Sequence, residues 1–80
     1  MRLDYKIIGE TILRIRNKKG ISQEVLSGFA GIARTHLTMI ENGTKKPNLE
    51  TVFKISEALG MKPSELIKEI ENAISNEDRA

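Results

Sequence analysis

The stretch from residue 22 to residue 43, SQEVLSGFAGIARTHLTMIENG, most constrains the fold, because it predicts two short helices joined by a sharp corner. Ser22 is a favoured N-cap for the first helix, since its hydroxyl can accept a hydrogen bond from a free backbone N–H. Gly31 follows that helix where the chain must turn, and a residue without Cβ turns there at little cost. The second helix begins near Arg34 and stops before Gly43. The stretch therefore predicts a helical hairpin.

The hairpin has an apolar side and a polar side, as helical spacing requires. The apolar residues are Leu26 with either Phe29 or Ala30 in the first helix, Ile32 at the corner, and Leu37 and Ile40 in the second helix. The side chains left on the outside of the second helix are Arg34, Thr35, Thr38 and Met39. A small polar and cationic outer face is typical of a helix-turn-helix that reads DNA, although hairpins of this outline also occur as plain packing units.

Composition excludes several classes of function. The chain has 80 residues and no cysteine, which predicts one small domain without disulfides or thiolate metal sites in a reducing cytoplasm. No apolar run approaches the ~20 residues that span a bilayer, so no membrane partner is expected. One histidine and no HExxH or P-loop pattern leave little for an active site. We expect a protein that is not an enzyme, with no catalytic residue, metal or cofactor.

The net charge of +2 hides an uneven distribution. Residues 1–54 contain ten Lys or Arg against five acidic residues, whereas residues 55–80 contain three against six. A basic half that includes the hairpin, with an acidic half away from it, suits a polyanion bound at one end. The alternative is that these charges only solvate the surface.

Three more helices are predicted around the hairpin, and no strand pattern occurs. The first follows the capping residue Asp4 and contains Gly9, which could permit a close backbone contact. The other two follow the hairpin, one after the capping residue Asn48 and one beginning at Pro63. We therefore expect an all-α fold of five helices. The expected limits are residues 1–75 for a single domain and residues 76–80 for a disordered tail.

The last predicted helix carries an apolar stripe that continues late into the helix. A domain this small needs only part of such a stripe to close its core. We interpret the stripe as a homodimer contact, with local packing under the preceding helix as the alternative. The predicted dimer residues are Leu66, Ile67, Ile70 and Ile74.

Between Ile8 and Leu66 the chain contains IGETILRIRNKKGISQ, RTHLTMIENG and KPNLETVFKISEALGMKPSEL, and at these separations it resembles the phage repressor and Cro (Xre-type) helix-turn-helix family. The resemblance implies a lambda-repressor-like fold with the helix-turn-helix at helices two and three. It also implies a transcriptional regulator that binds a near-palindromic operator in double-stranded DNA as a homodimer, through the major groove. RNA polymerase would be blocked or recruited according to where the operator lies. The segment Arg34-Thr35-His36 also looks like the controller proteins of restriction–modification systems.

The resemblance assigns roles to individual residues. Base contacts are implied for Arg34, Thr35, Thr38 and Met39. DNA-backbone contacts are implied for Gln23, Asn42, Lys45 and Lys46. Gln23 has an alternative role as a brace for the recognition helix, and His36 is either a phosphate contact or a surface histidine. Arg16 and Glu41 correspond to an ion pair that ties the first helix to the end of the recognition helix.

The chain departs from the family pattern at three positions. Ser27 replaces a common alanine and is still small enough for the helices to cross. Ala33 stands where a Ser or Thr usually caps the recognition helix, a loss of about 0.5–2 kcal/mol. Met39 replaces a frequent polar or basic residue and could instead pack against a thymine methyl group.

A competing function is a protein-interaction module. The same five helices could dock on a toxin or on the transcription machinery through the apolar C-terminal helix, and the weak overall charge supports this alternative. The regulator interpretation requires the four base-contact side chains to point outward together.

Overall fold

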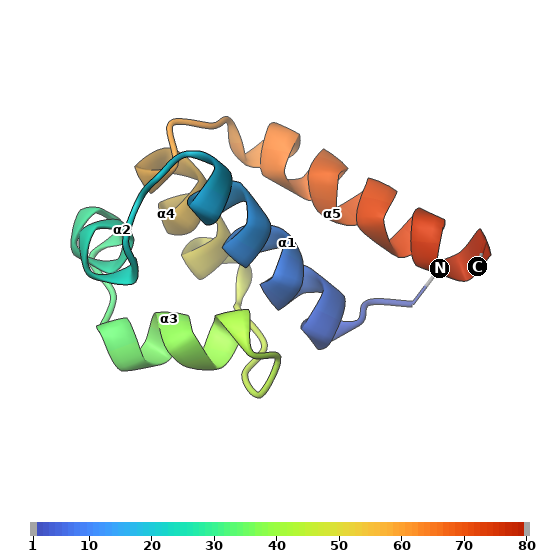
Figure 1. Ribbon diagram of the computed structural model, residues 1–80, viewed down its shortest axis with the longest axis horizontal. Helices are drawn as coiled ribbons and strands as arrows, with labels where there is room; N and C mark the ends of the chain where they lie inside the picture. Colours follow the sequence, from blue (N-terminus) through green and yellow to red (C-terminus); the bar gives the residue numbers. More distant parts are fainter. Residues whose placement is uncertain (1, 80) are drawn as a thin grey trace.

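The computed structural model describes residues 2–79, which form five α-helices joined by short loops (Figure 1). The helices are α1 (Tyr5–Lys18), α2 (Gln23–Ala30), α3 (Arg34–Glu41), α4 (Leu49–Ala58) and α5 (Pro63–Arg79). No strand occurs within the described span, so the predicted all-α fold of five helices is confirmed. None of these helices is long and apolar enough to cross a membrane.

Side-chain caps explain where three of the helices begin. Asp4, Ser22 and Asn48 each accept a hydrogen bond from a backbone N–H of the following first turn, at 2.9, 3.1 and 2.8 Å. These are the three caps predicted from the sequence. Helix α3 begins after Ala33, which makes no side-chain cap bond. Helix α3 therefore has the uncapped start that the sequence predicts.

Helix α5 begins at Pro63 after a residue with no capping side chain. The Glu65 carboxylate compensates, because it accepts a hydrogen bond from the backbone N–H of Lys62 at 2.7 Å. This contact is the half of a capping box that comes from the third helical position. A carboxylate in the first turn also interacts favourably with the helix dipole.

The far end of α5 extends past the expected domain limit at residue 75. The helix continues to Arg79 through residues 76–79, which were expected to form a disordered tail, and residue 80 lies outside the described span. No glycine or proline follows Pro63 to interrupt the helix. Ile74, only 1% exposed, anchors its last turns to the core.

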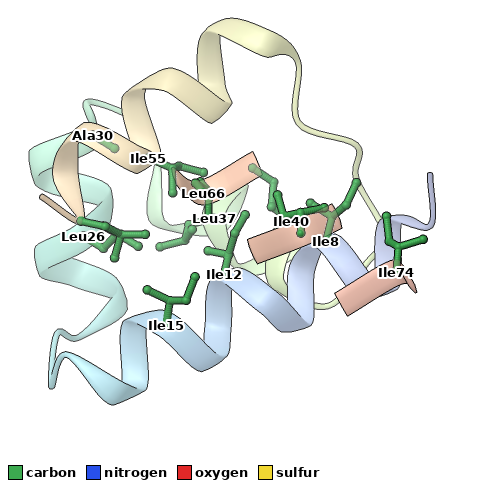
Figure 2. Packing of buried hydrophobic residues seen from close by; sticks show 12 residues of the cluster. Ile8, Ile12, Ile15, Leu26, Ala30, Leu37, Ile40, Ile55, Leu66 and Ile74 are labelled. Carbon is green, nitrogen blue, oxygen red and sulfur yellow. The ribbon is translucent and has the colours of Figure 1, made fainter. Parts of the chain in front are cut away.

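The core is one cluster of buried apolar side chains contributed by all five helices (Figure 2). Helix α2 contributes Leu26 and Ala30, whereas Phe29 is 75% exposed. Of the two candidates that the sequence left open, Ala30 is therefore the core residue. It lies four residues after Leu26 on the inner face, and Phe29 turns outward.

Gly9 allows α1 to pass directly over the end of α3. A Cβ placed on Gly9 would collide with the backbone oxygen of Ile40 and lie 2.7 Å from the backbone oxygen of Glu41. The close backbone contact that the sequence suggested is therefore confirmed. It fixes the position of α3, which carries the predicted reading face.

Candidate nucleic-acid interface

The outer face of α3 is open to solvent, and Figure 1 shows this helix along one edge of the molecule. The exposed side chains on it are Arg34, Thr35, Thr38 and Met39. The opposite face carries Leu37 and Ile40, each 0% exposed and packed in the core. All four residues predicted to contact bases therefore lie outside the core, on one side of a helix whose other side is fixed.

A buried ion pair fixes the C-terminal end of α3. The Arg16 guanidinium donates through Nε to Glu41 Oε2 at 2.7 Å and through Nη2 to Glu41 Oε1 at 3.0 Å. Its Nη1 donates to the backbone oxygen of Ile21 at 2.9 Å. Both side chains are almost fully buried, and this two-pronged geometry is the strong form of such a pair. The predicted tie between α1 and the end of α3 is present.

Gln23 links the start of α2 to two positions on α3. Its Nε2 donates to Glu41 Oε1 at 2.8 Å, and its Oε1 accepts from the Thr38 hydroxyl at 3.1 Å. These contacts are those of a brace, the second of the two roles considered for this residue. The brace joins the ion pair to Thr38 on the outer face of α3. The residue spacing alone gives no sign of this brace.

The loop after α3 is closed by its own side chains. Asn42 Oδ1 accepts from the backbone N–H of Thr44 at 3.0 Å and from its hydroxyl at 2.7 Å. The Thr44 hydroxyl is also 3.2 Å from the backbone oxygen of Met39. The carbonyl of Asn42 is therefore occupied, and its NH2 group is the part that could meet a phosphate. Thr44 was not predicted, although an Asn-Gly-Thr sequence is a recognisable turn signal.

The remaining predicted phosphate contacts lie around this loop or on α3. Lys45 and Lys46 are exposed, and the Lys46 ammonium lies 5.6 Å from the centre of the Tyr5 ring. That cation–π contact holds the lysine near the start of α1. His36 is half-buried on α3 beside the outer face.

The predicted dimer residues of α5 require a correction. Leu66, Ile70 and Ile74 are 0%, 7% and 1% exposed and belong to the core of the protomer, so local packing is their role. Only Ile67 of the four is accessible, at 45%. Periodicity identified an apolar stripe but could not show which residues another helix of the same chain already covers.

An apolar groove lies beside Ile67 and was not predicted. It has a volume of about 470 Å³, and its lining includes Leu3, Pro47, Leu49, Val52 and Ile67. Leu3 and Leu49 are 68% and 66% exposed. The signal for this groove in the sequence is the start of α4, where Leu49 lies off the core face of that helix.

Comparison with known proteins places these features in a family. The helix-turn-helix family model matches residues 12–66, which is more than half of the chain. Control protein C.BamHI of Bacillus amyloliquefaciens is 37% identical over 62 residues, covering 76% of each chain. Control protein C.MunI of a Mycoplasma species is 37% identical over 70 residues, covering 85% of this chain and 95% of the relative.

A solved structure gives the same result. The restriction–modification controller protein C.AhdI from Aeromonas hydrophila superposes with a TM-score of 0.76 at 32% identity, over 79% of this chain and 96% of that one. The five helices and the hairpin at α2 and α3 thus match those of its relatives. The chain belongs to the helix-turn-helix (Xre-type) family of transcriptional regulators, and its relatives include control proteins of restriction–modification systems.

Proposed function

We propose that the chain is a sequence-specific DNA-binding regulator that acts as a homodimer on a near-palindromic operator. Each subunit would place α3 in one major groove, with half-sites about 34 Å apart. The observation that carries the proposal is the open outer face of α3, whose side chains project from a helix fixed by the core and by the Arg16–Glu41 pair. The structure of C.Esp1396I bound to a 25 base pair operator site supports the proposal, because that protein has the same fold.

The outer face of α3 offers several kinds of base contact. The Arg34 guanidinium matches O6 and N7 of guanine, a pairing that discriminates by about 1–3 kcal/mol. Thr35 and Thr38 offer hydroxyl and methyl groups to base edges. Met39 is an apolar probe suited to the thymine methyl group. Together these side chains supply charge, hydrogen bonding and apolar contact.

The loop after α3 supplies the proposed phosphate contacts. Lys45 and Lys46 are exposed on it, and each phosphate that a cation neutralises contributes about −0.9 to the slope of log K against log salt. The NH2 group of Asn42, with its carbonyl already bonded to Thr44, could donate to the same backbone. His36, half-buried on α3, is the remaining proposed phosphate contact. These contacts would set the register in which α3 reads bases.

The apolar groove is the proposed dimer surface, replacing the buried part of the α5 stripe. Leu3, Leu49 and Ile67 line it from separate segments of the chain and are 68%, 66% and 45% exposed. Large side chains gathered and exposed in this way mark an interaction surface more often than an idle one. A second copy is the occupant that a two-fold operator requires, because a two-fold contact uses the same surface on both subunits.

Selection of bound sites from a random duplex pool tests the proposal, followed by titration of the selected site at two salt concentrations. We expect a selected site with two-fold symmetry, a steep salt dependence and a stoichiometry of two chains per duplex. No sequence preference together with a shallow salt dependence would instead favour the protein-interaction module. The exposed apolar groove is the observation that favours the protein-interaction module as a second function.

A further inference from the structure

The hydroxyl of Thr38 lies between two groups that can only accept hydrogen bonds. Its Oγ1 is 3.1 Å from Gln23 Oε1 and 3.0 Å from the backbone oxygen of Arg34. A hydroxyl has one proton to donate and two lone pairs to accept with. The proton is therefore directed toward the protein, whichever of the two oxygens receives it.

The ion pair fixes which end of the Gln23 amide faces Thr38. Gln23 Nε2 donates to Glu41 Oε1 at 2.8 Å, and the same carboxylate accepts two bonds from Arg16. A flipped amide would place its oxygen against a carboxylate oxygen, a contact between two acceptors. The amide oxygen must therefore face Thr38, where it is an acceptor for the hydroxyl.

On the basis of the proposed function, we propose that Thr38 reads DNA only as a hydrogen-bond acceptor. Thr38 is exposed, so in the proposed complex its hydroxyl lone pairs and its methyl group would be available to the major groove. The donors that base edges offer there are the exocyclic amino groups, N6 of adenine and N4 of cytosine. The partner of Thr38 is accordingly one of these amino groups, and neither a guanine or thymine oxygen nor a phosphate, all of which need a donor.

The first step of the test compares Thr38→Val with the wild type. Valine has the shape of threonine and keeps a methyl group but has no hydroxyl, so hydrogen-bonded reading is lost together with the hydroxyl's contacts to Gln23 and to the backbone of Arg34. Site selection with both proteins identifies the operator position at which the variant relaxes base preference. Thr38→Ser retains the hydroxyl and is expected to keep the preference at that position. Thr35→Val is the matched control on the same face, and it should leave this position unchanged.

The second step replaces single groups of the base pair at that position. One duplex lacks the amino group, with purine in place of adenine or pyrimidin-2-one in place of cytosine, and another carries a 7-deazapurine without the N7 acceptor. Loss of the amino group should weaken wild-type binding about fivefold more than it weakens Thr38→Val, as expected for one neutral hydrogen bond. The 7-deaza duplex should affect both proteins equally. The comparison between the two proteins removes any effect of the analogue on base pairing itself.

The outcomes separate the inference from the function on which it rests. A wild-type protein that selects no sequence overturns both. A wild-type protein that selects an operator, with a Thr38→Val variant that relaxes no position, overturns only the acceptor role. The acceptor role is also overturned if the 7-deaza duplex, rather than the duplex without the amino group, weakens wild-type binding more than it weakens Thr38→Val binding.

Discussion

Arg34 is the residue on which the proposed base discrimination would most depend. Its guanidinium is exposed on the outer face of α3, and two parallel bonds to one guanine are worth about 1–3 kcal/mol of discrimination. We expect Arg34→Ala to relax preference at one position in each half-site while leaving the others intact, as measured by site selection. Arg14→Ala is the control, because that exposed arginine pairs with Glu69 of α5. Uniform weakening on all sequences would make Arg34 a phosphate contact.

Gly9 shows how one missing side chain sets the position of an element. Gly9→Ala would drive a Cβ into the backbone at Ile40, and since backbone cannot move aside cheaply, we expect a loss of about 1–3 kcal/mol or more in the free energy of unfolding. Urea denaturation measures this change.

Gly28 provides the matched control. It also lies inside a helix, but a Cβ there meets nothing within 4 Å, so Gly28→Ala should stabilise the protein by roughly 0.5–1 kcal/mol. Equal effects of the two substitutions would contradict the role given to the α1–α3 contact.

At the scale of the elements, the link between α1 and α3 depends on a buried charge pair. Glu41→Gln leaves the Arg16 guanidinium buried without a charged partner, and removal of one partner of a buried pair costs about 3–5 kcal/mol. We expect a loss of this order in the free energy of unfolding, measured by chemical denaturation.

Glu50→Gln is the control for that substitution. Glu50 is 3.7 Å from Lys54 in an exposed i,i+4 pair of α4, which is worth about 0.3–0.5 kcal/mol. A Glu41→Gln variant no less stable than Glu50→Gln would show that other contacts hold α3 in place.

The helices could be predicted from local chemistry, whereas the choice of core residues also depends on long-range packing. The caps Asp4, Ser22 and Asn48 act within one turn, so the sequence reveals them directly. The outward phase of α3 follows from the spacing of its core residues. Phe29 was ambiguous, because i+3 and i+4 are both helical spacings and only the packing of α2 decides between them.

At the scale of the whole molecule, packing between helices explains why only Ile67 of the four predicted dimer residues is accessible. Ile70 reads as part of an exposed stripe in α5, but other helices of the same chain cover it to 7% exposure. The residue spacing gave no sign of the Gln23 brace, which only the family resemblance suggested, because it depends on side chains brought together from α2 and from both the middle and the end of α3. Contacts of this kind exist only after the chain has folded.

Ile67→Glu tests the proposed dimer surface. Since Ile67 is 45% exposed, a charge there should leave the protomer folded, lower the sedimentation mass to that of one chain and weaken operator binding. Ser64→Glu adds the same charge at another exposed position of α5 and should change neither. If the sedimentation mass of Ile67→Glu is unchanged, the groove is not the dimer contact. Ile70→Glu is unsuitable as a test, because it would unfold the protomer.

The division of α3 into an inner and an outer side has a consequence for how such a chain can diversify. Leu37, Ile40 and Glu41 anchor the helix, whereas the side chains at 34, 35 and 39 make no hydrogen bond within the described residues. We expect substitutions at those three positions to leave the fold unchanged. Position 38 is different, because its hydroxyl is hydrogen-bonded to Gln23. In the proposed regulator, the operator sequence could therefore change through positions 34, 35 and 39 without loss of stability, whereas a change at position 38 would also remove a contact to Gln23.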